Sequence, residues 1–392
     1  MLPLDGITIV DFTRVLSGPY CTMLLADMGA RVVKIEQPGK GDDTRQWGPP
    51  FAEGESAYFL SINRNKESVT LDLKARDSRA ALEQLIAKAD VVVENFRPGT
   101  MTKLALDYAT LAPKYPRLVY CSISGFGQTG PRRHEPGYDA VMQAEGGLMS
   151  ITGSADGPPY RLGVAISDIV SGMFAAQGIS MALFARERTG RGQLVDIGML
   201  DSVAALLSYQ AAIYFITGAA PGRMGNRHPT IVPYQTFPTA DGEFVLAVGN
   251  DEQWRKFCGV AGIEPEERFA TNRQRVVSHA ELERTIADKL RAHPRQYWIE
   301  RLNAAGVPCG SVRALHEVFT DPQLAAREMI AHVEHATIGP LRLLGVPVKL
   351  SDTPAAVRRA PPTLGQHTDA VLCGDLGMTR EAVADMRARG VI

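Results

Sequence analysis

The sequence predicts an α/β protein built on an open sheet of parallel strands. Between residues 7 and 124, short β-rich runs alternate with segments whose apolar residues have helical spacing. Neighbouring parallel strands need a crossover connection, which is usually a helix, so this alternation is typical of β-α-β units. A helical region and a hairpin pattern follow further along the chain.

The first elements are expected where β-branched residues gather between turn residues. Strands are predicted at residues 7–12, 31–36, 68–73, 91–94 and 118–124. Between them, helices are predicted at 77–89 and at 20–28, the latter ending at Gly29, a residue suited to a C-cap. Beyond them we expect helices at 138–147, 169–186 and 200–216, and a strand at 194–197.

A change in composition marks a second unit. Residues 218–233 are rich in Gly, Pro and polar residues, as linkers are. Residues 234–248 carry a hairpin pattern, with Asp241-Gly242 between two apolar runs. The chain to about residue 301 is then helical and charged, and short strands are expected again at 341–350, before a proline-rich loop at 360–362.

Length and charge exclude several classes of protein. The 392 residues suggest two or three domains. With 42 Lys and Arg against 43 Asp and Glu, the net charge of −1 argues against a nucleic-acid-binding surface. The two most apolar stretches contain Asp168, Asp196 and Asp201, which argues against membrane spans.

Cysteine usage and the first residues point to the cytoplasm. The five cysteines are far apart, with no C-x-x-C pair and no histidine at ligand spacing, so we expect neither disulfides nor a metal site. The beginning of the chain, MLPLDGITIVDF, enters a strand pattern at once, so no signal peptide is expected.

Two segments resemble a dinucleotide-binding site without meeting its requirements. Residues 125–130 match G-x-G-x-x-G, but the prolines at 131–136 exclude the helix that would face a pyrophosphate, so a loop is expected. The turn at residues 13–19 has only one glycine, Gly18, and Glu36 some 20 residues later is expected to be a solvated strand end. An NAD-dependent dehydrogenase is therefore kept only as an alternative.

Several linked segments resemble the class III CoA-transferases, the formyl-CoA transferase or CaiB–BaiF family. They are DFTRVLSGP (11–19), LADMGA (25–30), VKIE (33–36), ENFRPG (94–99), SGFGQTGP (124–131), GNRHPTIVPY (225–234), GND (249–251) and LGQHT (364–368). Within that family, GDDTRQWGPPF (41–51) and SINRNK (61–66) are most similar to the succinate–hydroxymethylglutarate CoA-transferase branch.

The resemblance implies an enzyme that moves CoA from an acyl-CoA to a free carboxylic acid, and it assigns the nucleophile to Asp168. The reaction would pass through an aspartyl anhydride and an aspartyl-CoA thioester, with succinyl-CoA and a dicarboxylate as the substrates of that branch. Read from the residues alone, Asp168 precedes a helical pattern and could simply be an N-cap. The two roles are compatible, since a helix N-terminus favours an ionised carboxylate.

The resemblance also implies where CoA and the acids bind. The CoA-binding residues it assigns are Leu16, Ser17, Leu71, Lys74, Asn95, Phe96, Arg97, Lys103 and Tyr138. The substrate pocket would contain Trp47, Tyr58, Gly249 and Asn250, with Arg45 as a guess for holding a second carboxylate. Taken alone, each charged residue would more often be a solvated surface group, and Tyr138 could be a buried aromatic with a satisfied hydroxyl.

The chain departs from the formyl-CoA branch at several positions. That branch has glutamine in place of Leu16, arginine near Pro38 and lysine in place of Pro136, and its site-closing loop has more glycines than the one at Gly249. These differences affect the recognition of phosphate and acyl groups but leave Asp168 unchanged.

A racemase or epimerase on the same fold is the second alternative. The racemase branch has histidine where Tyr138 stands, and a tyrosine with a pKa of about 10 is a poor base at neutral pH. A CoA-binding protein without activity is a weaker possibility, against which Asp168 counts. The transferase is therefore favoured.

For the whole chain, the expected architecture is a discontinuous, Rossmann-like large domain with a smaller α+β domain inserted. Residues 1–200 would begin the large domain, 201–224 form a linker, 225–325 form the small domain, and 326–392 return and complete the large one. The resemblance further implies an interlocked homodimer, no tightly bound cofactor besides CoA as carrier, no metal, and neither nucleic acid nor membrane as partner.

Overall fold

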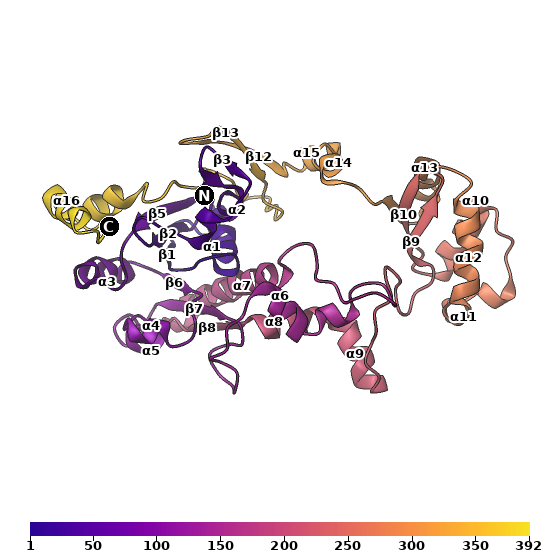
Figure 1. Ribbon diagram of the computed structural model, residues 1–392, viewed down its shortest axis with the longest axis horizontal. Helices are drawn as coiled ribbons and strands as arrows, with labels where there is room; N and C mark the ends of the chain where they lie inside the picture. Colours follow the sequence, from indigo (N-terminus) through magenta and orange to yellow (C-terminus); the bar gives the residue numbers. More distant parts are fainter. The chain divides into compact units, whose positions relative to one another are not determined.

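The computed structural model describes residues 1–392, and its largest element is a six-stranded parallel sheet (Figure 1). The strands lie in the order β5-β2-β1-β6-β7-β8, and every neighbouring pair is parallel. Their bounds are β1 Thr8–Asp11, β2 Arg31–Glu36, β5 Lys66–Thr70, β6 Val91–Glu94, β7 Val119–Ser124 and β8 Leu194–Gly198. The predicted α/β class with a parallel sheet is confirmed.

The order of these strands places a ligand site between β1 and β6. From β1 the chain adds β2 and β5 on one side, then returns to add β6, β7 and β8 on the other. Loops that leave β1 and β6 therefore diverge to opposite faces of the sheet. Open α/β sheets bind ligands in the crevice at the carboxyl ends of such strands.

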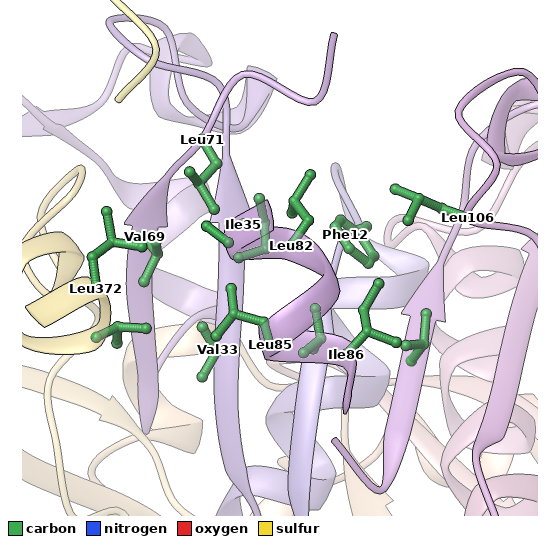
Figure 2. Close-up of a cluster of buried hydrophobic side chains, with 14 of the residues drawn as sticks. Phe12, Val33, Ile35, Val69, Leu71, Leu82, Leu85, Ile86, Leu106 and Leu372 are labelled. Atoms are coloured by element: carbon green, nitrogen blue, oxygen red, sulfur yellow. The ribbon is translucent and has the colours of Figure 1, made fainter. Parts of the chain in front are cut away.

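Alternating side chains of the strands bury both faces of the sheet. On one face, Val33, Ile35 and Val69 pack against Leu82 and Ile86 of α3 (Arg79–Ala87), as Figure 2 shows. The tail joins this cluster, through the π-helix Ala370–Asp375 and α16 (Arg380–Ala388). The opposite face packs against α1 (Ser17–Asp27), α7 (Ile166–Thr189) and α8 (Met199–Leu206).

Short elements connect the main ones within this part of the chain. The helices are α2 Ala57–Ile62, α4 Thr100–Lys103, α5 Tyr108–Leu111, α6 Asp139–Glu145, α9 Ser208–Thr217 and α15 Pro322–Ala326, with 3-10 turns at Asp43–Gln46, Arg76–Ser78 and Leu148–Ile151. Helix α14, Leu315–Val318, belongs to the second compact unit described below. Two antiparallel pairs accompany them, β3 Phe51–Ala52 with β4 Glu55–Ser56, and β12 Ile330–His335 with β13 Gly339–Leu344.

Three predicted elements differ from the observed ones. The strand expected at 68–73 is β5, which begins at Lys66, because Lys66 and Glu67 are buried by ion pairing rather than exposed. The helix expected at 200–216 is broken into α8 and α9, which meet at 75° beside Ser208, a residue with φ of 42°. The strands expected at 341–350 are the hairpin β12–β13, which lies earlier in the chain.

The chain divides into two compact units. Unit 1 comprises Met1–Leu148, Arg161–Phe215 and Pro322–Ile392, and unit 2 comprises Met149–Tyr160 and Ile216–Asp321. Unit 2 has its own core, which includes Phe237, Phe244 and Trp254. Its elements are β9 Tyr234–Thr239, β10 Gly242–Ala247, β11 Cys309–Ser311, α10 Asp251–Ala261, α11 Asn272–Val277, α12 His279–Leu290 and α13 Arg295–Ala304, with a 3-10 turn at Glu267–Phe269.

Helix α7 is long and apolar enough to cross a membrane by length and composition, as is the bent pair α8–α9. In the structure α7 is part of the core of unit 1, where Ala175, Ile179 and Ala182 are buried against the sheet. Its first turn carries Asp168. The apolar composition of α7 is therefore explained by its packing in the core of unit 1.

Candidate active site

A cavity of about 160 Å³ lies at the carboxyl ends of β1, β6 and β7, where the strand order predicts a site. Asp168 lines it. The other lining residues come from the loops after these strands and from the start of α6, and they include Arg14, Ser17, Asn95, Phe96, Arg97, Ser124 and Tyr138. The structure therefore brings together residues that lie more than 150 positions apart in the chain.

The loops after β1 and β6 are tied to each other by Asn95. Its Oδ1 accepts a hydrogen bond from the Arg14 N–H at 2.8 Å, and its Nδ2 donates to the Arg14 carbonyl at 2.7 Å. The Arg14 guanidinium also lies 5.0 Å from the centre of the Phe96 ring. Because both ends of the Asn95 amide are used, this side chain fixes the shape of the cavity wall.

Two buried charged residues, Lys34 and Asp42, bind the backbone of the loop after β1. Lys34, fully buried, donates to the Thr13 carbonyl at 2.7 Å and pairs with Asp42 at 2.9 Å. Asp42 in turn accepts from the backbone N–H of Val15, whose φ of 69° is unusual for a β-branched residue. Such a buried network is favourable only when its members are paired, so it gives the loop one defined conformation.

Asp168 lies in the first turn of α7 and is only 8% exposed. The N-cap position belongs to Ala165, so the alternative that Asp168 caps the helix does not hold. The side chain and backbone of Ser17, the first residue of α1, both donate hydrogen bonds to its carboxylate. Helices α1 and α7 approach closely at Gly172, where a Cβ atom would lie 2.6 Å from the Ser17 carbonyl oxygen.

The environment of Asp168 favours its protonated form. Burial and the negative charge of Asp139 raise the pKa of Asp168 to about 7, against the lowering effect of the Ser17 hydrogen bonds. We expected the helix N-terminus to keep this carboxylate ionised, and desolvation outweighs that effect. A carboxylate of raised pKa is a stronger nucleophile when ionised, which suits a group that attacks a carbonyl.

Asp139 is positioned by the start of α7 and by its own helix. Its Oδ1 accepts from the backbone N–H and the hydroxyl of Ser167, at 2.9 and 2.6 Å, and its Oδ2 accepts from Gln143 at 2.7 Å. These three donors hold Asp139 beside the residue that precedes Asp168. Asp139 and Arg14 were not among the candidate residues, although Arg14 stands inside the motif at 11–19 and Asp139 directly follows the candidate Tyr138.

Tyr58 and Trp47 form an aromatic pair, and Tyr58 lies close enough to Asp168 to be affected by its charge. Their rings meet edge to face with centroids 5.2 Å apart. Burial, followed by the charges of Asp168 and Asp139, raises the pKa of Tyr58 to about 12, so its phenol stays neutral. Tyr58 packs with Ala165 and Ile169, which flank Asp168 in the chain.

A second cavity of about 570 Å³ adjoins the first and contains two of the residues predicted to bind CoA. It is lined by Leu71 and Lys74, and it shares Arg14, Phe96 and Arg97 with the Asp168 cavity. The shared residues connect the two cavities along one edge of the sheet. Leu16 and Lys103 line neither cavity: Leu16 packs with Met23 and Ile62, while Lys103 is exposed at the end of α4.

Arg45 and Glu36 differ from their predicted roles. Arg45 donates to both oxygens of Glu36 at 2.8 Å and to the Pro362 carbonyl at 3.1 Å, so its guanidinium has no free pair of donors for a substrate carboxylate. Glu36, expected to be solvated, is buried by this pairing. Burial would raise the pKa of Glu36, but Arg45, Lys34 and Ser68 hold it below its usual value.

Of the remaining candidate residues, Tyr138 lines the Asp168 cavity, whereas Gly249 and Asn250 lie in the second unit. Tyr138 is the N-cap residue of α6 and is 63% exposed, so it is not the buried aromatic of the alternative interpretation. Gly249 and Asn250 belong to unit 2, where the Asn250 side chain accepts from the Gln253 N–H at 2.8 Å and caps α10.

The glycine-rich loop at 125–130 is not followed by a helix, as the sequence predicted. Gly125 instead lies against Gly137, whose Cα atom would be 2.8 Å from a Cβ atom at position 125. The glycine is required by this crossing of two backbone segments beside the cavity. Without a following helix, the loop lacks the helix N-terminus that would face a pyrophosphate in a dinucleotide site.

A buried carboxylate of raised pKa at the switch point of a parallel sheet, next to a cavity that basic residues line, suits an α/β enzyme that transfers acyl groups. The chain matches the sequence profile of CoA-transferase family III over residues 4–368, and it belongs to that family. The resemblance found in the sequence is thereby confirmed, and the chain is an enzyme of this class.

Similar proteins cover nearly the whole chain. The succinyl-CoA:glutarate CoA-transferase of Mus musculus is 40% identical over 396 residues, which span 100% of this chain and 91% of that protein. The succinate–glutarate CoA-transferase of Agrobacterium fabrum is 42% identical, over 94% of this chain and 95% of its own. Among solved structures, a CaiB/BaiF family protein from Brucella suis superposes with a TM-score of 0.84 at 40% identity, covering 95% of this chain and 99% of that one.

Proposed function

We propose that this enzyme moves CoA from succinyl-CoA to a second dicarboxylic acid, with Asp168 as the nucleophile. The observation that carries the proposal is the buried Asp168 carboxylate in the cavity between the β1 and β6 loops. Relatives named for succinyl-CoA use glutarate, D-citramalate or mesaconate as the other acid, and one named for acetyl-CoA uses oxalate. Succinyl-CoA is thus the donor that most of these names share.

The proposed reaction begins with attack of an Asp168 oxygen on the thioester carbonyl. The C–S bond breaks, the CoA thiolate leaves with its electron pair, and a mixed anhydride of Asp168 and succinate forms. The thiolate then attacks the aspartyl carbonyl, which releases succinate and leaves CoA attached to Asp168 as a thioester. The acceptor carboxylate repeats the two steps in reverse order, so the enzyme returns to its starting state without a net proton change.

Ser17 is proposed to stabilise the tetrahedral intermediates at the aspartyl carbonyl. Its backbone N–H and hydroxyl already point at the Asp168 carboxylate. When the aspartyl carbonyl is attacked, the developing oxyanion would take the place of the carboxylate oxygen that accepts these hydrogen bonds. Donors fixed before the reaction stabilise such a charge without reorganisation.

The two joined cavities are the proposed path of CoA. Lys74 and Arg97 would contact its phosphate groups, and Leu71 and Phe96 would flank flat or apolar parts. CoA is proposed as a substrate carrier, with no tightly bound cofactor. The cytoplasmic location, the roles of Gly249 and Asn250, and the absence of nucleic-acid or membrane partners stay predictions from the sequence.

Arg14 replaces Arg45 as the proposed partner of the second carboxylate of the acid. Arg14 and Arg97 are the two cations that line the Asp168 cavity. In the variant Arg14→Gln, we expect kcat/KM for glutarate, relative to that for the monocarboxylate pentanoate, to fall about tenfold, because a charged hydrogen bond is lost with one acid only. Initial rates with succinyl-CoA as donor measure this ratio.

The control for this prediction is Arg133→Gln, which changes an exposed arginine that does not line the cavity. Effects on the shared donor cancel in the ratio of the two acids. An unchanged ratio in the Arg14 variant would remove Arg14 from acid recognition while leaving the transferase proposal intact.

An acceptor panel tests the proposed function itself. Succinyl-CoA and acetyl-CoA, each supplied with a dozen mono- and dicarboxylates, should give new acyl-CoA products by mass spectrometry, with dicarboxylates and succinyl-CoA preferred. No transfer to any acid, combined with exchange of the α-proton for deuterium, would favour the racemase alternative. The geometry already disfavours it, since no histidine lines the Asp168 cavity.

We also propose that two copies of the chain assemble, with α7 at the contact. Met173, Phe174, Met181 and Phe184 are exposed apolar residues of α7, and Met181 and Phe184 lie one helical turn apart. A second copy is the proposed cover because the resemblance implies a homodimer, and contiguous apolar surface of this kind usually marks an interface.

For this assembly, we expect wild-type protein to elute with twice the chain mass of 42.5 kDa in light scattering. The double variant Met181→Glu with Phe184→Glu should lower the mass toward one chain, because two charges would be desolvated in the contact. Val277→Glu, which changes a residue 84% exposed in unit 2, serves as the control. A wild-type mass of one chain would contradict the proposed assembly.

A further inference from the structure

A buried glutamate that the proposed chemistry does not use precedes the loop after β6. Glu94 is the last residue of this strand and is 5% exposed. With Ser122 and Gln128 it lines a cavity of about 220 Å³, and none of these three residues lines the Asp168 cavity or the second cavity. Glu94 can therefore affect the proposed CoA path only through the residues that it holds.

The carboxylate of Glu94 accepts two hydrogen bonds from defined donors. Its Oε2 atom accepts from the backbone N–H of Phe96 at 2.8 Å, and its Oε1 atom accepts from the hydroxyl of Ser122. The side-chain Nε2 of Gln128 donates to the Ser122 oxygen at 2.7 Å. Because an amide nitrogen can only donate, the Ser122 oxygen is the acceptor of that bond and its own proton is available to Glu94.

The glycine-rich loop at 125–130 is fastened to the same row of residues. Glu94 and Ser122 are partners in the register of β6 and β7, and Ser122 and Asp196 are partners in that of β7 and β8. The backbone N–H of Gln128 lies 3.1 and 3.0 Å from the two carboxylate oxygens of Asp196, to which it donates. Gln128 thus connects the loop to β8 through its backbone and, through Ser122, to Glu94.

The burial of Glu94 is explained by the groups that it holds. Burial raises the pKa of Glu94 to about 7, and the hydrogen bonds from Ser122 and Phe96 oppose this rise. Both donors are neutral, so they offset only part of the cost of burying a carboxylate. An apolar side chain would avoid that cost, but it would take the acceptor away from the Phe96 N–H.

Phe96 is the residue through which this network reaches the proposed CoA path. It lines both the Asp168 cavity and the second cavity. Its ring lies 5.0 Å from the Arg14 guanidinium, and its backbone is held by Glu94. Phe96 is therefore fixed at its ring and at its backbone before any ligand binds, which lowers the entropic cost of binding.

We propose that Glu94 is a positioning residue for CoA, because it holds Phe96 in the conformation that contacts the coenzyme. Glu94 itself contacts neither CoA nor the reacting atoms. The inference rests on the proposed function, since it takes the two joined cavities as the path of CoA. Loss of this carboxylate should weaken the binding of CoA and leave the chemistry at Asp168 in place.

Titration calorimetry with CoA and initial rates with succinyl-CoA and glutarate test the role of Glu94. In Glu94→Ala we expect Kd for CoA and KM for succinyl-CoA to rise about tenfold, because a hydrogen bond to a charged acceptor is lost, while kcat changes less than about twofold. Glu94→Gln should bind CoA nearly as the wild type does. Its amide oxygen can still accept from Phe96, and its amide nitrogen can donate to Ser122.

The matched control is Glu67→Ala, which removes a glutamate of β5 that is 8% exposed and lines neither cavity of the CoA path. It should leave Kd for CoA unchanged. If circular dichroism shows Glu94→Ala to be unfolded, Ser122→Ala replaces it, with an expected rise in Kd of about threefold because one of the two donors to Glu94 is removed.

Three results would overturn the proposal: an unchanged Kd in the folded variant, a fall in kcat with Kd unchanged, or an equal rise of Kd in Glu67→Ala. Each of them leaves the proposed function intact, provided that the wild-type enzyme binds CoA and transfers it. A wild-type chain without affinity for CoA would instead contradict the proposed function, and this inference with it.

Discussion

Replacement of Asp168 by asparagine is expected to lower kcat for CoA transfer by about four orders of magnitude or more, because the amide cannot form the anhydride. The wild-type enzyme, incubated with succinyl-CoA without an acceptor and then quenched in acid, should carry a covalent adduct. Digestion and mass spectrometry should locate the adduct on the peptide that contains Asp168. The variant should show none.

The matched control is Asp201→Asn, the same substitution in the first turn of α8. It should keep the adduct and most of the activity. Full activity of the Asp168 variant without an adduct would contradict covalent catalysis by this residue. An adduct on another acidic residue would support the covalent mechanism but identify that residue, and not Asp168, as the nucleophile.

The second large effect expected is on the pH dependence of the first half-reaction. Attack requires the ionised carboxylate, and the pKa of Asp168 is raised to about 7 by burial and by Asp139. The value of kcat/KM for succinyl-CoA should therefore rise about tenfold per pH unit below this value and level off above it. Stopped-flow measurements of CoA release over a pH series give the profile.

Asp139→Asn should move the midpoint of this profile to lower pH, because it removes the negative charge that opposes ionisation of Asp168. Its Oδ1 atom can still accept from Ser167, so the start of α7 keeps a hydrogen-bonded partner. Asp43→Asn is the control, since Asp43 lines the same cavity but is not a cause of the raised pKa. An unchanged midpoint in the Asp139 variant would show that the charge of Asp139 does not raise the pKa of Asp168.

The hydrophobic pattern of the sequence predicted the strands of the sheet well, but it predicted the burial and pairing of the charged residues poorly. Strands β2 and β6 were expected within their observed bounds, since both are runs of β-branched residues. Glu36 at the end of β2 was expected to be solvated, and Arg45 was a guess for holding a substrate carboxylate, yet the two form a buried ion pair. Hydrophobic periodicity treats a charged residue as exposed, and it has no means to recognise a partner further along the chain.

The same limit applies to Asp168. Motif likeness selected Asp168, but its pKa depends on Ser17, far earlier in the chain, and on Asp139. Such juxtapositions are properties of the folded chain.

The sequence by itself determined the α/β class, the family and the residue proposed as nucleophile, since strand periodicity and linked motifs are local patterns. The tertiary structure decided which strands are neighbours, so that the loops after β1 and β6 share one cavity. It also decided which charges are paired and buried, as for Arg45 with Glu36, and which line the cavity, as for Arg14, whose Nη1 atom pairs with Asp43 at 3.4 Å. The reason is that pairing and desolvation depend on distances in space, which spacing along the chain does not set.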